Sequence, residues 1–245
     1  MEKKILADAI KHRCSRRKYV QKELPQEIID QLSASITAYN KNSELNMQLV
    51  LNQPEAFQGL RKSYGFFTGV QHYIALVGKK NQAHVQEKLG FFGELLVLEA
   101  TELGLGTCWV GGTYDQKLCT CAVAADEQLY AVITIGYVPE EQSLREQLIM
   151  HGSHFHTKEI GKIYTIETQP PMWFFTSLEA VYKAPSTQNK KPTHIIYHLD
   201  NTITAAVDDL NAFEIDLGIA KAHFWLTAPK GYWQWGNQGQ YLDFI

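Results

Sequence analysis

The pattern of hydrophobic positions predicts alternating helices and strands in the first part of the chain. Apolar residues at helical spacing predict amphipathic or buried helices, and the acidic residues that follow Pro25 suit the first turn of a helix. Dense apolar runs of strand length predict strands with both faces buried. The predicted helices cover 5–12, 88–103 and a stretch that begins at Pro25, and the predicted strands cover 47–51, 73–78 and 130–137.

The pattern restarts after a polar, His-rich stretch, which we interpret as a connector over 141–170. The order of helix, loop, strand, helix and glycine turn then occurs a second time, which suggests two unequal repeats over 1–140 and 171–245. The elements predicted in the second repeat are a helix over 174–182, a strand over 194–199 and a long helix over 204–226.

Composition places the chain among ordinary globular proteins. Of its 245 residues, 45% are hydrophobic and 20% are charged, and the net charge of −3 argues against nucleic acid as a partner. The N-terminal segment MEKKILADAI lacks the apolar core of a signal peptide, and no apolar stretch is long enough to span a bilayer. We expect free thiols and a cytoplasmic location, because the cysteines lack the spacing of a zinc site: Cys14, Cys108, Cys119 and Cys121.

Three segments carry candidate chemistry. RCSRRKY over 13–19 concentrates four cations and a hydroxyl, and the forked hydrogen bonds of Arg suit a phosphate dianion. APSTQNKKP over 184–192 joins a proline turn to compact donors and acceptors. GLGTCWVGG over 104–112 has glycines that let backbone approach a flat ligand closely. The structural alternatives are a solvated basic loop, a loop between a helix and a strand, and a helix end before a buried strand.

Taken in this order, the segments resemble the FMN-dependent nitroreductase family. RCSRRKYVQKELPQEIIDQL is similar to the family's N-terminal signature, in which arginines and a serine precede a proline and a helix. GLGTCWVGG and ITIGYVPE resemble the strand beside the isoalloxazine and the strand after it, and LEAVYKAPSTQNKKPTHIIY resembles the family's Ala-Pro-Ser segment. The resemblance covers nearly the whole chain and implies an α+β fold of nitroreductase type.

The Ala-Pro-Ser segment stands far from its usual place. In the family it follows the Arg signature within a few dozen residues, whereas here it occurs only after residue 180. The resemblance therefore implies two tandem, unequal nitroreductase-like repeats that form a single-chain pseudo-dimer, each keeping a different half of one site. It also implies one FMN per chain and a monomer, because the family's dimer interface would be internal.

The resemblance assigns cofactor contacts residue by residue. The residues of the Arg signature would contact the phosphate and the ribityl chain of the flavin. The backbone of two glycines, beside an apolar wall, would lie near the flavin N5 and O4. The second repeat would supply the remaining contacts, with Lys in place of the usual Gln. The implied residues are Arg13, Ser15, Arg17, Trp109, Val110, Gly111, Gly112, Pro185, Ser186, Asn189 and Lys191. Lys158 or His156 would add a further phosphate contact.

The implied function is an FMN-dependent NAD(P)H oxidoreductase. Hydride would pass from the nicotinamide to flavin N5 and then to a small electron-poor acceptor, nitroaromatic or quinone-like, with no side chain required as acid or base. One alternative is a degenerate protein that binds flavin or another phosphorylated ligand without turnover, since Cys14 and Lys191 depart from the family pattern. A weaker alternative is a dehalogenase-like or flavin-fragmenting relative. We expect no metal at the histidines over 151–156, and we expect the tryptophans near the C-terminus to pack in the core or to border the acceptor pocket.

Overall fold

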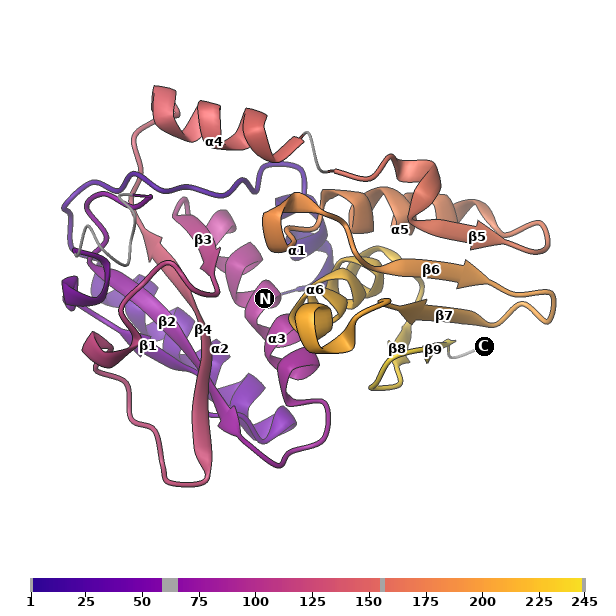
Figure 1. Cartoon of the computed structure of the whole chain (residues 1–245), viewed down its shortest axis with the longest axis horizontal. Coiled ribbons are helices and arrows are strands. Elements are labelled where there is room, and N and C mark those ends of the chain that lie inside the picture. The colour runs from indigo at the N-terminus through magenta and orange to yellow at the C-terminus, as the bar shows by residue number, and fades with distance from the viewer. Residues whose placement is uncertain (1, 59–65, 155–156, 244–245) are drawn as a thin grey trace. The chain divides into compact units, whose positions relative to one another are not determined.

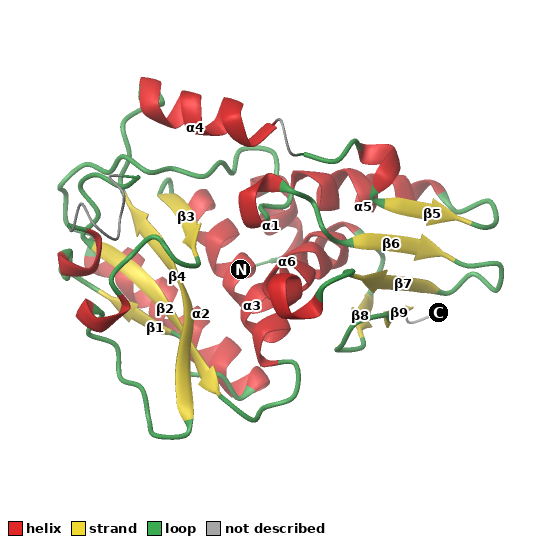
Figure 2. Cartoon of the chain, in the orientation of Figure 1, coloured by secondary structure: helices red, strands yellow, loops and turns green. Residues whose placement is uncertain are grey.

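The computed structural model describes residues 2–58, 66–154 and 157–243, and these form two compact units (Figure 1). The first-sheet unit consists of His12–Val85 and Leu96–Met150. The second-sheet unit consists of Met1–Lys11, Gln86–Leu95 and His151–Ile245. Helices and strands occur in both units, which confirms the α+β class (Figure 2). Among the described residues, no helix is long and apolar enough to cross a membrane.

The first-sheet unit is built on an antiparallel sheet in the order β1-β2-β4-β3. Strand β2 is buried along nearly its whole length, as its dense apolar sequence predicts. The core of the first-sheet unit includes edge-to-face contacts of the Phe57 ring with the rings of Phe67 and Tyr73. The unit contains α2 (Gln26–Ser43), β1 (Gln48–Val50), η1 (Glu55–Phe57), β2 (His72–Lys79), β3 (Gly106–Val110), η2 (Gln116–Leu118) and β4 (Glu127–Gly136). Two helices contribute residues to both units, α3 (Val85–Glu102) and α4 (Leu144–His154).

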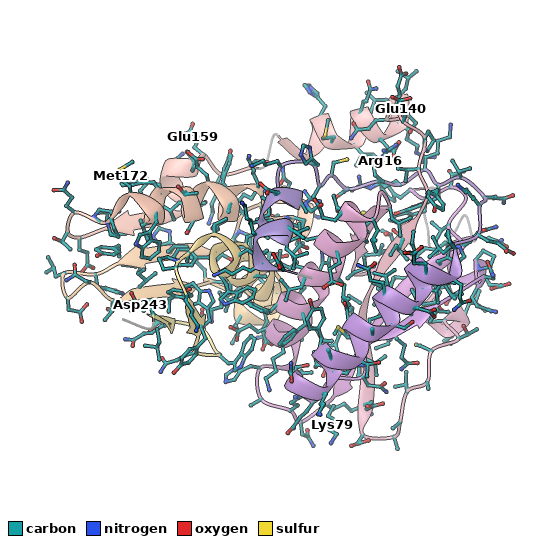
Figure 3. The ribbon with its side chains drawn as sticks, turned by 180° about the vertical axis from the view of Figure 1, so that it is seen from behind. Arg16, Lys79, Glu140, Glu159, Met172 and Asp243 are labelled. Atoms are coloured by element: carbon teal, nitrogen blue, oxygen red, sulfur yellow. The ribbon has the colours of Figure 1, made fainter. Side chains whose placement is uncertain are left out.

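The second-sheet unit carries a sheet in the order β5-β6-β7-β9-β8, in which β5 and β6 are parallel and the other pairs antiparallel. Phe224 of α6 packs against the rings of Trp233 and Tyr241, so the C-terminal aromatics include core residues, as predicted. The unit contains α1 (Lys3–Ala9), η3 (Ile160–Lys162), β5 (Tyr164–Ile166), α5 (Met172–Lys183), η4 (Thr187–Asn189), β6 (His194–Tyr197), β7 (Ile203–Ala206), α6 (Leu210–Thr227), β8 (Gly231–Trp233) and β9 (Gly239–Asp243). The exposed Met172 marks the start of α5 in Figure 3.

One prediction from the hydrophobic pattern is wrong. The predicted helix over 204–226 begins too early, because residues 203–206 form β7 and pair with strands on both sides. Helix α6 starts only after Asp209, whose carboxylate accepts the N–H of Ala212 as an N-cap. The stretch expected as a connector over 141–170 contains α4 and β5, and its role as a connector between two repeats stays a prediction.

The compact units do not follow the predicted repeats. Their segments are discontinuous, whereas the repeats were expected over 1–140 and 171–245 with a connector over 141–170. The two sheets also differ in the number and order of their strands. Division into tandem repeats, and with it the pseudo-dimer, stays a prediction.

Candidate functional site

The Arg segment lies beside β3 in the first-sheet unit. Ser15 forms a parallel bridge with Thr107, and the N–H of Arg16 donates to the Thr107 carbonyl at 2.8 Å. Gly106 makes this approach possible, since a Cβ there would lie 3.1 Å from the Arg16 side chain and 2.3 Å from that of Val138. The structure thus brings together two of the three segments singled out in the sequence.

Arg13 carries a buried donor that lacks a partner. Its Nε is enclosed and makes no hydrogen bond to any described residue. Burial raises the pKa of the Cys108 thiol, while the positive charges of Arg17 and Arg13 and a hydrogen bond from Ser15 oppose that rise. Both guanidinium groups therefore act on one point of β3. An unpaired buried donor is unfavourable, so this corner suits an anion that would satisfy it.

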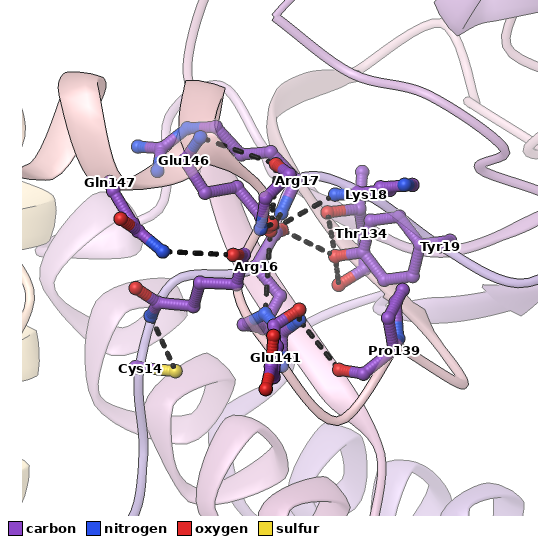
Figure 4. Close-up of polar contacts among 12 residues, drawn as sticks. Cys14, Arg16, Arg17, Lys18, Tyr19, Thr134, Pro139, Glu141, Glu146 and Gln147 are labelled. Carbon is purple, nitrogen blue, oxygen red and sulfur yellow. Dashed lines mark hydrogen bonds and ion pairs between the residues drawn. The ribbon is translucent and has the colours of Figure 1, made fainter.

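Arg16 is already engaged within the first-sheet unit. It is 7% exposed, and its Nε lies 3.3 Å from Oε1 of Glu146 in α4 (Figures 3 and 4). Its terminal nitrogen donates to the carbonyls of Pro139 at 2.8 Å and Glu141 at 3.3 Å. The charge of Arg16 is neutralised, so Arg13 and Arg17 are the arginines of the segment that remain for a ligand. Glu146 was not among the candidate residues from the sequence, because no hydrophobic pattern identifies it as a buried position.

The glycines after β3 face open space. Gly111 and Gly112 are exposed, and a Cβ built at either would meet no atom within 4 Å. Val110 differs, because its side chain is 2% exposed and belongs to the core cluster of the unit. Of the two residues predicted to form an apolar wall, Trp109 is half-buried, so part of its side chain is accessible to a ligand. The side chain of Val110 is buried, so only its backbone could contact a ligand.

The Pro-Ser-Thr-Gln-Asn segment lies in the second-sheet unit as η4 and its flanks. Gln188 (φ 52°), Asn189 (φ 58°) and Lys191 (φ 52°) adopt left-handed backbone, which is costly for residues other than glycine. Asp216 of α6 contacts the start of this turn, where both of its carboxylate oxygens lie 3.1 Å from the N–H of Thr187. Asp216 is a second residue that the motif search missed.

The predicted ligands in this segment already make contacts within the unit. The Ser186 hydroxyl accepts the Lys191 N–H at 3.1 Å, and the Lys191 ammonium donates to the Ala184 carbonyl at 2.6 Å. The Asn189 amide donates to the Thr157 hydroxyl at 2.8 Å. Pro185 begins the segment in the same unit.

Two predictions about the site as a whole stay open. The Arg segment and the Pro185–Asn189 segment belong to different units, so their sharing of one site stays a prediction. Of the two residues expected to add a phosphate contact, Lys158 is half-buried in the second-sheet unit, and His156 lies outside the described residues.

Comparison with known proteins identifies the family. The family described as "Putative TM nitroreductase" matches residues 5–228. The chain belongs to this nitroreductase family. A crystal structure of a "putative nitroreductase" from Thermotoga maritima is 21% identical and covers 96% of this chain and 91% of that chain at a TM-score of 0.64, which shows the nitroreductase-like fold. A search of curated proteins gives no match.

Other solved structures resemble parts of this nitroreductase-family chain. A nitroreductase family protein from Clostridium difficile is 16% identical and covers 67% of this chain and 98% of that chain, with a TM-score of 0.48. A nitroreductase with bound FMN from Bacteroides fragilis is 20% identical and covers 57% of this chain and 91% of that chain, with a TM-score of 0.43.

The first-sheet unit of this nitroreductase-family chain fits a flat, phosphorylated cofactor. The Arg13 Nε, which has no hydrogen-bond partner among the described residues, and the nearby Arg17 charge suit a phosphate. The open backbone at Gly111 and Gly112 suits the close approach of a planar ring. The sequence predicted these residue types, and the structure adds that their donors and their space are present.

Asp216 makes the stability of the nitroreductase-family chain depend on pH. Burial raises its pKa from 3.8 to about 6, and hydrogen bonds with Thr187 and the charges of Lys191 and Lys190 limit the rise. The folded state thus binds the proton more tightly than the unfolded state, so this group's contribution to stability falls as pH rises from about 3.8 to about 6. Asp216→Asn should remove that loss and raise the free energy of unfolding at neutral pH by on the order of 1 kcal/mol.

Urea denaturation between pH 4 and 7 measures this effect. The matched control is Asp208→Asn, which changes an exposed carboxylate just before α6. A less stable Asp216→Asn protein at neutral pH would show that the hydrogen bonds of the carboxylate outweigh the cost of its burial.

Proposed function

We propose that the chain is an FMN-dependent NAD(P)H oxidoreductase of the nitroreductase type that acts on a small electron-poor acceptor, nitroaromatic or quinone-like. Family membership supports the class of activity. The single observation that carries the cofactor assignment is the buried Nε of Arg13, which makes no hydrogen bond within the described part of the chain and lies in the segment that bridges to β3. A phosphate oxygen would satisfy such a donor.

The chain's own part in this function is to bind and orient. Arg13 and Arg17 would hold the phosphate by charge-assisted hydrogen bonds. Ser15 would contact the phosphate or the ribityl chain. The N–H groups of Gly111 and Gly112 would donate to the flavin ring near N5 and O4. The chemistry that bound FMN supplies is hydride acceptance from NAD(P)H and delivery to the acceptor. No side chain is assigned as an acid or a base.

The contribution of the second-sheet unit to the cofactor site is part of this proposal. Pro185, Ser186 and Asn189 match the segment that the family's partner subunit supplies, and Lys191 stands where that segment usually has Gln. The support for including them is the sequence resemblance and the order of the motifs.

The test of the function is direct. The purified chain is titrated with FMN while flavin fluorescence is recorded, and the complex is then mixed with NADH or NADPH without oxygen. We expect saturable binding and loss of the oxidised-flavin absorbance with at least one nicotinamide. A chain without affinity for FMN would refute the proposal, and FMN that binds but resists both nicotinamides would favour a flavin-binding protein without turnover.

The split-site prediction is tested by stoichiometry. We expect one FMN per chain at saturation, because the repeat with the phosphate arginines lacks the Pro-Ser-Thr-Gln-Asn turn and the other repeat lacks the arginines. The ratio of flavin absorbance to protein concentration after gel filtration measures it. Two FMN molecules per chain would contradict the division of one site between two repeats.

A further inference from the structure

Helix α4 places a buried carboxylate against the backbone of the Arg segment. Glu146 is 3% exposed. Its Oε1 accepts the N–H of Arg17 at 2.7 Å and the N–H of Lys18 at 3.1 Å, and it lies 3.3 Å from Nε of Arg16 (Figure 4). Its Oε2 accepts both the N–H and the hydroxyl of Ser143 at 2.8 Å. Every one of these residues belongs to the first-sheet unit.

Glu146 is a fixed negative charge at neutral pH. Burial alone would raise the pKa of its carboxyl, but the backbone N–H groups of Arg17, Ser143 and Lys18 and the Ser143 hydroxyl bind the ionised form more strongly. The pKa is therefore lowered to about 2. A carboxylate that receives so many donors holds their positions firmly, because an unmade bond to a buried charge is costly.

The bonds to Glu146 act where the Arg17 side chain leaves the backbone. Successive N–H groups of Arg17 and Lys18 point at one oxygen, while on the opposite edge the carbonyl of Arg17 accepts the N–H of Thr68 at 2.9 Å. The segment is thus held from two sides at this residue. The pairing with Glu146 also engages Arg16 within the unit, so Arg13 and Arg17 are the arginines of the segment left for an anion.

We propose that Glu146 is a positioning residue that holds Arg17, and through the shared backbone Arg13, in the arrangement that binds the phosphate of FMN. This inference rests on the proposed function. Glu146 itself touches no cofactor. A positioning role and a purely electrostatic role predict opposite effects on phosphate binding. Removing a negative charge near a phosphate site should strengthen phosphate binding, whereas losing a positioning residue should weaken it.

The experiment compares Glu146→Gln with the wild-type chain in binding FMN and riboflavin, which lacks the phosphate. We expect the affinity for FMN to fall roughly tenfold, the effect of weakened hydrogen bonds to a charged group, while the affinity for riboflavin stays the same. Gln147→Ala is the matched control, because Gln147 is the next residue of α4 and is exposed, and its side chain donates to the Gln142 carbonyl. It should leave both affinities unchanged.

A double-mutant cycle separates positioning from general loss of structure. In an Arg17→Ala background the effect of Glu146→Gln on FMN affinity should largely vanish, since the side chain that it positions is gone. Urea denaturation establishes that each variant is folded. If Glu146→Gln does not fold, Ser143→Ala, which keeps the carboxylate and removes one donor to Oε2, should weaken FMN binding by a smaller factor and leave riboflavin binding unchanged.

The outcomes distinguish this inference from the function on which it rests. A wild-type chain that does not bind FMN overturns both. A wild-type chain that prefers FMN to riboflavin, with a Glu146→Gln variant that keeps or increases that preference, overturns the positioning role alone. Equal losses for FMN and riboflavin also overturn it, because they would mean that Glu146 supports the whole unit and not the phosphate site.

Discussion

Replacing Arg13 and Arg17 together by Ala should weaken FMN binding by at least tenfold. Hydrogen bonds to charged groups contribute about 1.5–3 kcal/mol each, and the proposed phosphate site loses two cationic donors in this variant. The effect should be large because Arg16 cannot replace them, being held by Glu146 and by the carbonyls of Pro139 and Glu141. Fluorescence titration with FMN at fixed ionic strength measures the loss.

Controls separate the phosphate contact from simple loss of charge. Lys18→Ala removes an exposed cation next in sequence, and it should change FMN affinity little. Riboflavin binding should be nearly the same in the double variant and the wild-type chain. An unchanged affinity for FMN in the Arg13→Ala/Arg17→Ala protein would show that the phosphate binds elsewhere.

The sequence was sufficient to predict that the Arg segment suits a phosphate, but not which of its arginines are engaged within the protein and which remain for a ligand. Three arginines in five residues are equivalent on composition. Their roles differ only in the folded chain, where a contact with the distant Glu146 buries Arg16, and where the Arg13 Nε makes no hydrogen bond to a described residue. Such long-range polar pairing leaves no hydrophobic period for a sequence analysis to detect.

The same reasoning explains which elements were predicted. Strand β2 and helix α3 bury apolar side chains, so their periodicity marks them clearly. Helix α4 was not predicted, because its buried Glu146 is a carboxylate and two of its leucines are exposed. Strand β7 was taken for helix because its few residues follow no distinctive pattern, and its pairing with β6 and β9 decides its conformation.

Of the substitutions considered, Lys221→Met should lower the free energy of unfolding the most. Lys221 is fully buried in α6, and its ammonium lies 2.5 Å from Oε1 of the equally buried Glu87 and donates to the carbonyls of Gln234 and Gly236 at 3.0 and 2.9 Å. Glu87 in turn accepts the N–H of Gly236 at 2.6 Å. Removing the cation leaves a buried carboxylate without its counter-ion, which costs about 3–5 kcal/mol. The free energy of unfolding in urea measures the loss.

A second substitution shows that the lost counter-ion, and not the changed shape, causes this destabilisation. Burial lowers the pKa of Lys221, and the Glu87 carboxylate opposes that shift, so each charge is tolerated only because the other is present. Glu87→Gln combined with Lys221→Met removes both charges and should recover a large part of the stability, since a neutral pair needs no buried counter-ion. Lys183→Met, at an exposed position near the end of α5, is the matched control and should change stability by less than about 0.5 kcal/mol. A double variant no more stable than Lys221→Met alone would mean that the lysine acts through its packing and its bonds to the Gln234 and Gly236 carbonyls, with little contribution from the ion pair.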